Sequence, residues 1–182
     1  MEHILHTAQL RSQAKNLKMG DRVILSGPVY TARDAAHKRM FEQMNAGKPL
    51  PFALQDAVIY YAGPTPAKPG MAVGSCGPTT SGRMDPYAPR LLDLGLVGMI
   101  GKGERSQPVV EAIRRNRAVY LCAIGGAGAL ACQHITACTV LDYEDLGCES
   151  VKRLEFDRFP LIVAIDSEGS NIFESPSRKL AE

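Results

Sequence analysis

Three loops of the chain combine glycines with hydroxyl or cationic side chains at points where a strand ends and a helix begins. Glycine lets the backbone approach a ligand closely, and the free N–H groups at the start of a helix favour an anion. With basic side chains beside them, such loops predict a site for a small anion, or for two carboxylates of one molecule. In chain order, the candidate residues are Ser26, Thr31 and Arg33, then Thr79, Thr80, Ser81 and Arg83, and finally Lys102.

Arg33 and Arg83 are the strongest candidates for contacting a carboxylate, because a guanidinium can bind one through two parallel hydrogen bonds. An arginine in the first turn of a helix is slightly unfavourable against the helix dipole, which favours a ligand-binding Arg33 over a solvated one. Lys102, which lies between two glycines, is a similar candidate for contacting a carboxylate. The hydroxyls of Thr80 and Ser81 are as well explained by hydrogen bonds to the backbone of their own turn as by a role in binding a ligand.

Other kinds of site have less support in the residues. The run Gly125-Gly126-Ala127-Gly128 is a candidate backbone nest for an anion, but it lacks the GxGxxG spacing of a dinucleotide-binding loop. The chain has no GxSxG motif of a serine nucleophile. Metal-ligand spacing is missing from the four histidines, which are His3, His6, His37 and His134. The residues alone therefore predict an α/β domain with a small-anion site.

Cysteine usage and net charge narrow the class of protein. Five cysteines without a CxxC pair favour reduced structural thiols in a reducing compartment over a disulfide or metal framework. The formal net charge of +2 is too small for a nucleic-acid footprint, and no apolar run approaches the roughly 20 residues that span a bilayer. With no signal-peptide layout at its start, the sequence predicts a cytoplasmic protein that binds neither nucleic acid nor membrane. The cysteines are Cys76, Cys122, Cys132, Cys138 and Cys148.

Alternating strands and helices, an α/β pattern, are expected to position the loops. The first unit is a strand over 22–25, a turn at Ser26-Gly27-Pro28, and a helix over 31–46 with Thr31 as its N-cap. The proline-rich connectors are too short to mark a boundary, so residues 1–182 are predicted to form one domain. Further strands are expected over 57–61, 96–100, 118–124, 139–141, 151–156 and 161–165, and helices over 89–94, 108–116 and 129–135.

Two long motifs give the chain a resemblance to a known family. Residues 26–37 read SGPVYTARDAAH, and residues 77–85 read GPTTSGRMD. Both resemble the C-terminal domain of class I, iron–sulfur-dependent fumarases and the β subunits of L(+)-tartrate dehydratases. Shorter matches extend the resemblance to nearly the whole chain: LDLG at 92–95, MIGKG at 99–103, GGA at 125–127 and IDSEG at 165–169.

The resemblance implies a fold and a division of labour between two protein parts. The fold is a single swivelling β/β/α domain, and a [4Fe–4S] cluster is held by cysteines of the other domain or of a partner α subunit, not by this chain. Arg33, Arg83 and Lys102 match the family's cationic groups that bind the substrate. Thr79 matches a threonine that the family is thought to use in removing the proton next to a carboxylate. A free threonine is far too weak a base, so a partner-subunit carboxylate or a water relay has to take the proton onward.

The function that the resemblance implies is that of the β subunit of a two-subunit iron–sulfur hydro-lyase, which reversibly hydrates fumarate to malate. The expected partners are a small dicarboxylate and a cluster-bearing α subunit in a hetero-oligomer, with a homo-oligomer of the isolated chain as an alternative. Two other functions stay open, an L-tartrate dehydratase β subunit and a non-catalytic module that binds dicarboxylates. The candidate residues do not separate fumarate from tartrate.

Overall fold

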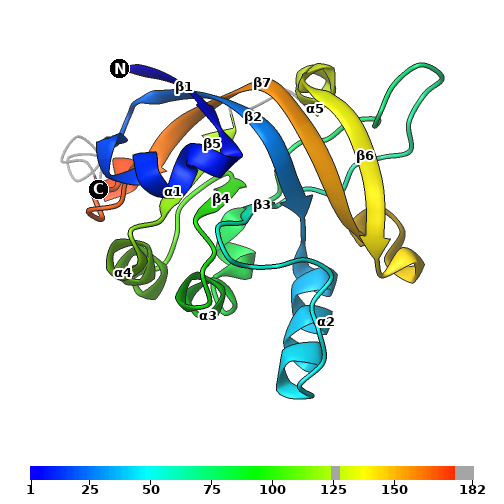
Figure 1. The fold of residues 1–182 in the computed structure, drawn as a ribbon, viewed down its shortest axis with the longest axis horizontal. Coiled ribbons are helices and arrows are strands. Elements are labelled where there is room, and N and C mark those ends of the chain that lie inside the picture. The colour runs from blue at the N-terminus through cyan, green and yellow to red at the C-terminus, as the bar shows by residue number, and fades with distance from the viewer. Residues whose placement is uncertain (124–127, 175–182) are drawn as a thin grey trace, which may run out of the picture.

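The fold is built around a closed ring of strands. The computed structural model describes residues 1–123 and 128–174, and within them seven strands form one sheet. β2 to β5 run parallel to one another, and β7 returns antiparallel to pair with both β5 and β2, which closes a ring of five strands. β1 extends the sheet beside β2, and β6 extends it beside β7 (Figure 1). The bounds are β1 Glu2–His6, β2 Arg22–Thr31, β3 Val58–Tyr60, β4 Gly98–Gly101, β5 Val119–Ala123, β6 Ile135–Asp142 and β7 Val151–Ile165.

Helices cover the outside of the ring. In Figure 1, α2, α3 and α4 lie on one side of the strands, and α3 packs against α4. The helices are α1 Leu10–Gln13, α2 Asp34–Asn45, α3 Ala88–Asp93, α4 Gln107–Asn116 and α5 Gly128–Ala131. Short 3-10 turns are η1 Thr7–Gln9, η2 Ala14–Asn16, η3 Ser81–Met84, η4 Cys132–His134, η5 Glu144–Glu149 and η6 Ile172–Glu174.

Residues of β3 alternate between two hydrophobic cores, as the two-residue period of a strand requires. Val58 and Tyr60 belong to a core built from side chains of all five ring strands and from α1, in the interior of the ring. Ile59 and the following Tyr61 belong to a second core, which they share with buried side chains of α2, α3 and α4. Both tyrosines are fully buried, so the end of β3 is held firmly on both faces.

The predicted turn at Ser26-Gly27-Pro28 is wrong, because β2 continues through it to Thr31. β7 pairs with β2 on both sides of this point, and the register shifts between Leu25 and Gly27, which marks a bulge. Gly27 has a φ of 105° there, a value that favours glycine, and a Cβ on it would meet the His6 ring at 2.6 Å. The Gly-Pro pair therefore bends a strand instead of ending it.

The helix that follows also starts later than predicted. α2 begins at Asp34 with Arg33 at its N-cap, so the prediction of Thr31 as the N-cap is wrong. The Thr31 side chain is fully buried, and its hydroxyl accepts a hydrogen bond from the Lys152 backbone N–H at 3.1 Å. Pairing with β7 thus outweighs the local preference of threonine for a helix cap.

The rest of the α/β pattern is largely confirmed, with β3, β4, β5, α3 and α4 within a few residues of their predicted bounds. The two strands predicted over 151–156 and 161–165 are one strand, β7, in which Arg158 has a φ of 52°. The helix predicted over 129–135 is the short α5 followed by the turn η4, and β1 and α1 are absent from the prediction. The glycine loop with Gly125-Gly126 lies outside the described residues.

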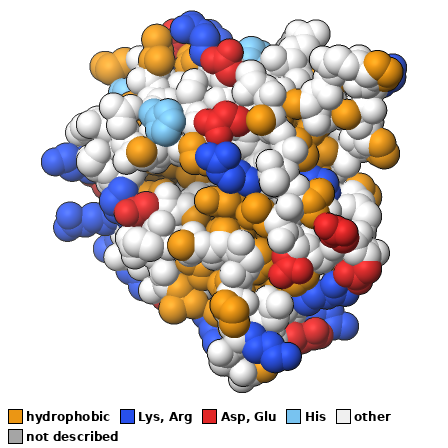
Figure 2. All heavy atoms as spheres, turned by 45° about the vertical axis from the view of Figure 1, so that its right-hand side comes forward, with side chains coloured by type: hydrophobic (Ala, Val, Ile, Leu, Met, Phe, Trp, Pro, Cys, Tyr) orange, Lys and Arg blue, Asp and Glu red, His pale blue; other side chains and the backbone are white. Residues whose placement is uncertain are grey.

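The side of the molecule that carries β6 has an apolar character. Figure 2 brings this side toward the viewer and shows hydrophobic side chains gathered around a hollow, with charged side chains near them. On β6 itself, Val140 is 43% exposed and Leu141 is 37% exposed. None of the helices in the described part of the chain is long and apolar enough to cross a membrane.

Candidate active site

Three of the predicted site residues lie where parallel strands end. Arg33 follows β2 by two residues, and Lys102 follows β4 directly. The segment that carries Thr79 runs beside these ends, since its N–H donates to the Tyr61 carbonyl, one residue past β3, at 2.7 Å. Thr80 then pairs with Lys102 in a parallel bridge. Because neighbouring parallel strands end at one edge of a sheet, Arg33, Thr79 and Lys102 share that edge.

Arg83 reaches the start of α2 from the turn η3. Its Nε lies 2.8 Å from Asp34 Oδ1 in an ion pair, and Asp34 is the residue after Arg33. Arg33 Nε lies 3.5 Å from Glu149 Oε1, a separation too long for a well-formed hydrogen bond. Each arginine therefore forms an ion pair through Nε with a carboxylate of this chain, and for Arg33 this contact is not a hydrogen bond. No described residue accepts a hydrogen bond from the terminal nitrogens of either guanidinium.

Four buried polar atoms, three at the start of α2 and one on the facing turn η5, lack a hydrogen-bond partner among the described residues. They are Arg33 Nε, Asp34 Oδ2, His37 Nε2 and Glu149 Oε1, and one further such atom lies on Thr7. Buried polar groups in proteins are nearly always paired, so a concentration of unpaired ones indicates a place built for a further polar partner. The free backbone N–H groups at the start of α2 favour an anionic one.

His37 stays neutral within this cluster. Its side chain is fully buried, and burial lowers its pKa to about 4, with the charge of Arg105 acting in the same direction. The Arg33 carbonyl can only accept, so Nδ1 of the neutral ring donates to it at 2.9 Å and Nε2 is left as an acceptor. The ring thus fixes the backbone of Arg33 without adding a charge.

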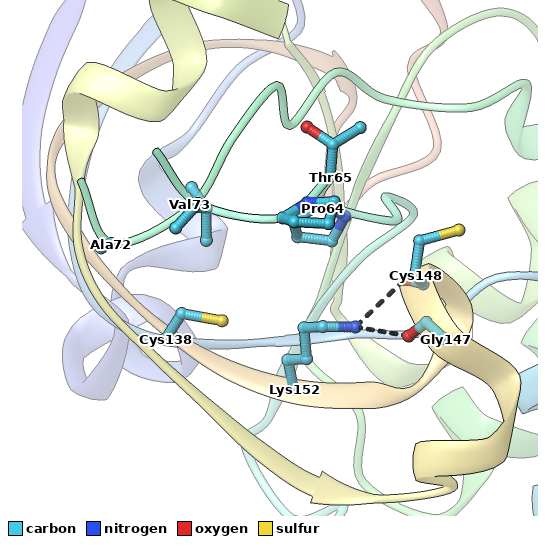
Figure 3. Close-up of a pocket in the computed structure, with 10 residues that line it drawn as sticks. Pro64, Thr65, Ala72, Val73, Cys138, Gly147, Cys148 and Lys152 are labelled. Atoms are coloured by element: carbon cyan, nitrogen blue, oxygen red, sulfur yellow. Dashed lines mark hydrogen bonds between the residues drawn. The ribbon is translucent and has the colours of Figure 1, made fainter. Parts of the chain in front are cut away.

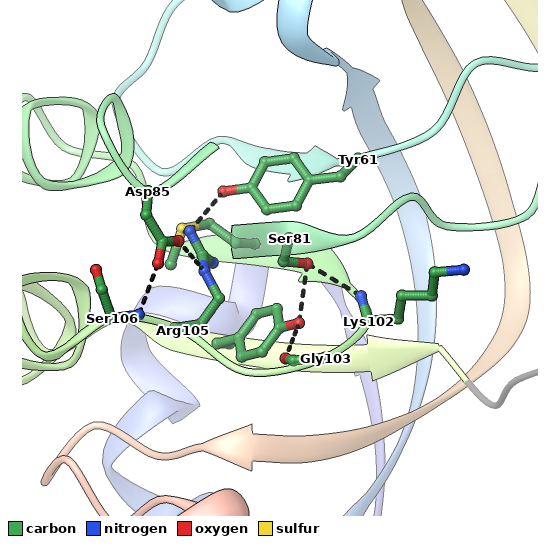
Figure 4. Close-up of polar contacts among 9 residues, drawn as sticks. Tyr61, Ser81, Asp85, Lys102, Gly103, Arg105 and Ser106 are labelled. Carbon is green, nitrogen blue, oxygen red and sulfur yellow. Dashed lines mark hydrogen bonds and ion pairs between the residues drawn. The ribbon is translucent and has the colours of Figure 1, made fainter. Parts of the chain in front are cut away.

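Ser81 anchors the loop that precedes η3. Its buried hydroxyl accepts a hydrogen bond from the Lys102 N–H at 3.0 Å and shares one with the Tyr120 hydroxyl at 2.9 Å (Figure 4). A Cβ on Gly101 would overlap this hydroxyl, so glycine is required where the two loops touch. Ser81 is therefore engaged inside the protein, whereas the Lys102 side chain extends away from this contact (Figure 4).

Sequence analysis missed a buried cation beneath these loops, Arg105. Its side chain is fully buried, Nε donates to Asp85 Oδ1 at 2.6 Å, and the guanidinium lies 4.9 Å from the centre of the Tyr120 ring (Figure 4). The other Asp85 oxygen accepts from the Ser106 N–H at 2.6 Å, at the start of α4. Arg105 is therefore a structural cation that ties the η3 loop to α4. Nothing in the polar run 102–107 distinguishes it from a solvated residue.

Two predicted hydroxyls are used in strand packing. Ser26 is in the middle of β2, where its hydroxyl accepts from the Arg158 N–H at 2.9 Å. Thr31 is buried between β2 and β7. Neither hydroxyl faces the start of α2 as a ligand-binding group, because each is used in strand packing.

The described cysteines do not fit an iron–sulfur cluster. Within the described residues, no group of three His, Cys, Asp or Glu side chains could hold a metal ion. Cys76 is fully buried, and burial raises its pKa to about 12, which disfavours the thiolate that binds iron. Cys122 and Cys138 lie on different strands, β5 and β6, and Cys148 is exposed in η5.

Comparison with known proteins finds one family throughout. A family described as Fumarase C-terminus matches residues 2–176. The chain is 42% identical over 159 residues to "Fumarate hydratase 1, mitochondrial" of Leishmania major, which is 84% of this chain and 28% of that relative. It is 36% identical over 168 residues to "Fumarate hydratase class I, aerobic" of Escherichia coli, which is 91% of this chain and 31% of that relative. The chain thus spans less than a third of the length of these two relatives.

A third relative has nearly the same length as the matched region. The "Putative L(+)-tartrate dehydratase subunit beta" of Methanocaldococcus jannaschii is 37% identical over 178 residues. The match covers 94% of this chain and 91% of that relative.

Proposed function

The chain belongs to the fumarase C-terminal family, and from this premise we propose that it is the β subunit of a two-subunit hydro-lyase that reversibly hydrates fumarate to malate. Its relatives bear the names of hydro-lyases. We propose a separate subunit because the match covers 91% of the relative named as a subunit beta, and less than a third of the two longer fumarate hydratases. Residues 1–182 are proposed to act in it as one domain.

The convergence of two arginines at the start of α2 carries this proposal. Arg33 precedes Asp34 in the chain and Arg83 forms an ion pair with Asp34, and no described residue accepts a hydrogen bond from the terminal nitrogens of either arginine. Fumarate and malate each bear two carboxylates, and a guanidinium binds one carboxylate through two parallel hydrogen bonds. Lys102 adds a third cation at the same edge, where it would stabilise the negative charge that develops when a proton leaves the carbon next to a carboxylate.

Thr79 is proposed to take part in that proton transfer. Its backbone is held by the Tyr61 carbonyl, and the residue is only partly exposed at the edge that it shares with Lys102. A neutral hydroxyl is too weak a base to keep the proton. The final acceptor is therefore proposed to be a carboxylate of the partner subunit or a water relay.

The [4Fe–4S] cluster is proposed to reside in a partner α subunit, because the described cysteines do not fit it. The purified chain should then be colourless and bind no stoichiometric iron. Single Cys→Ser changes in it should leave the cluster of the assembled enzyme intact. A cluster spectrum from this chain alone, lost on mutation of any one of its cysteines, would overturn this assignment.

An L(+)-tartrate dehydratase subunit is the second candidate function. It is favoured by the relative from Methanocaldococcus jannaschii, which matches the chain over almost its whole length. Tartrate and malate carry the same two carboxylates and differ by a hydroxyl, so the pair Arg33 and Arg83 suits both substrates.

Anaerobic reconstitution of the chain with a cluster-bearing α subunit from the same genome tests the proposal. The pair is assayed against fumarate, malate and both tartrates, and each protein is assayed alone as the control. Hydration of fumarate by the pair only is the expected result, and turnover of tartrate in its place selects the second candidate. No turnover of any of them, with tight dicarboxylate binding by this chain alone, would indicate a non-catalytic binding module.

A further inference from the structure

Glu149 is the last residue of the turn η5, and its side chain lies beside that of Arg33. Glu149 Oε1 lies 3.5 Å from Arg33 Nε, and the two side chains are 27% and 26% exposed. Gly63 packs against both segments, since a Cβ on it would lie 3.0 Å from the Cys148 carbonyl and 3.3 Å from Arg33 Cδ. Little space is therefore left between the η5 turn and the Arg33 side chain.

Lys152 holds the end of this turn in shape. Its ammonium donates to the Gly147 and Cys148 carbonyls, each at 3.1 Å (Figure 3). It also donates to the Ser150 hydroxyl at 2.6 Å. These acceptors use the three N–H bonds of the ammonium, and all are neutral oxygens. Lys152 is buried, and burial lowers its pKa. A buried lysine bonded in this way stabilises the carbonyls that a turn leaves unpaired at its end.

A single strand pair ties this turn to the start of α2. Thr31 and Lys152 are register partners in β2 and β7. The buried Thr31 hydroxyl accepts from the Lys152 N–H at 3.1 Å and donates to the Ser150 carbonyl at 3.4 Å. Arg33 follows Thr31 by two residues, and Glu149 precedes Lys152 by three. The strand pair therefore fixes both sides of the contact between Arg33 and Glu149.

We propose that Glu149 and Lys152 are positioning residues for Arg33. The Glu149 carboxylate attracts the Nε edge of the guanidinium across 3.5 Å, so that the terminal nitrogens face a substrate carboxylate, and Lys152 holds the turn that carries Glu149. The inference rests on the proposed role of Arg33 in binding substrate. Without the carboxylate, the guanidinium is free to rotate, and the prepared two-point geometry is lost on the free enzyme.

Lys152 also lines a neighbouring cavity, where it could bind a ligand instead of holding the turn. The cavity has a volume of about 300 Å³, and mainly apolar side chains line it, among them Pro64, Ala72, Val73 and Cys138 (Figure 3). A lysine at such a cavity would suit an anionic ligand with an apolar body. The three N–H bonds of Lys152 are already used by the turn, however, so the ammonium has no donor left for a ligand there.

A double-mutant cycle in the reconstituted complex tests the proposal. Glu149→Gln removes the charge and keeps the shape, and Lys152→Met removes the ammonium and keeps the length of the side chain. We expect each to lower kcat/KM for the dicarboxylate by about tenfold, mainly through KM, and to have no further effect in an Arg33→Ala background. The matched control is Arg153→Met, beside Lys152 on β7 and paired with Glu155, which should stay within about twofold of wild type.

The position of the Arg33 guanidinium can also be followed by NMR, without any enzyme activity. In the nitrogen-15 NMR spectrum of the full chain, the Arg33 Nε–H signal is assigned by its loss in Arg33→Ala. That signal should move in Glu149→Gln and in Lys152→Met, and it should keep its position in Arg153→Met. Thermal melting of each variant shows whether it is folded.

The outcomes separate the two proposals. If the Arg33 signal and KM are unchanged in both variants, or if their effects on kcat/KM add fully to that of Arg33→Ala, the positioning role is wrong. If the wild-type complex turns over no dicarboxylate and the Arg33 signal still moves as expected, the proposed function fails and the positioning of Arg33 stands.

Discussion

Arg83 Nε lies 2.8 Å from Asp34 Oδ1, and this ion pair joins the η3 loop to the first residue of α2. The Arg83 side chain is 54% exposed and that of Asp34 is 33% exposed. An ion pair open to water in this way contributes little to stability, typically about 0 to 1 kcal/mol. Its main effect is therefore on the direction in which the guanidinium points.

Replacement of Asp34 by Asn should impair substrate binding more than stability. We expect kcat/KM for the dicarboxylate to fall by about fivefold or more, because Arg83 loses its carboxylate partner, while the free energy of unfolding changes by less than about 1 kcal/mol. Kinetics and urea unfolding of the same protein measure both. Asp93→Asn, which breaks the exposed pair with Arg115, serves as the control and should leave kcat/KM unchanged. Equal kinetics for the two variants would contradict a directing role of Asp34.

Thr79→Ala should lower kcat far more than it raises KM. A group used in proton transfer acts in the transition state, so its loss appears in kcat and not in ground-state binding. Thr80→Ala should be milder, because the Thr80 side chain is exposed beside the bridge to Lys102. Steady-state kinetics of both variants in the assembled enzyme give the comparison. A near-normal kcat for an assembled Thr79→Ala complex would remove Thr79 from the proton transfer.

Arg105→Met should strongly destabilise the chain. The substitution leaves the Asp85 carboxylate, which is 13% exposed, without its buried cation, and breaking a buried pair in this way costs about 3–5 kcal/mol. Arg115→Met in the exposed pair with Asp93 is the matched control, with an expected cost below about 1 kcal/mol. Urea unfolding of both variants decides the matter. Similar losses for the two would mean that Arg105 is not a structural cation.

The stability of the chain should fall as the pH falls through the range set by His37. The pKa of its buried ring is about 4, below the ordinary value of 6.5, so between these pH values the unfolded chain binds a proton that the folded chain does not. The free energy of unfolding should therefore drop by on the order of 3 kcal/mol from pH 6.5 to pH 4. A His37→Gln variant lacks this titration. Its free energy of unfolding should be lower than that of wild type at pH 6.5, and it should change less between pH 6.5 and pH 4. Identical pH profiles for the two proteins would show that His37 does not titrate in this way.

Local patterns predicted much of the fold and failed where distant pairing decides. The alternation of strands and helices from β3 to β5 follows from short segments, each with its own hydrophobic period and stop signals. At Gly27 and Pro28 the same local rules predicted a turn, because β7, far along the chain, pairs through this point and keeps the strand extended. Thr31 failed as a helix cap for the same reason, since its hydroxyl bonds the Lys152 backbone instead.

In the candidate site, too, local sequence patterns identified some residues and missed others. Arg33, Thr79, Arg83 and Lys102 stand in loops with recognisable glycine, hydroxyl and cation patterns, so their selection needed only the sequence. Arg105 and Glu149 have no such pattern. Arg105 matters because it is buried against Asp85, and Glu149 matters because the pairing of β2 with β7 brings its turn to Arg33. Both properties arise only from the folded chain.

The central claim is that Arg33 and Arg83 hold the carboxylates of the substrate, and kcat/KM of their variants in the reconstituted enzyme tests it most directly. In a site that the proposed partner subunit closes and desolvates, loss of either charge pair with the substrate should cost about 2–5 kcal/mol, which is roughly thirty- to several-thousand-fold in kcat/KM. Arg33→Lys and Arg83→Lys should recover little of the loss in Arg33→Ala and Arg83→Ala, because an ammonium keeps the charge without the planar two-point geometry. Thermal melting confirms folding of each variant. If all four variants stay within about threefold of wild type, the two arginines do not bind the substrate carboxylates.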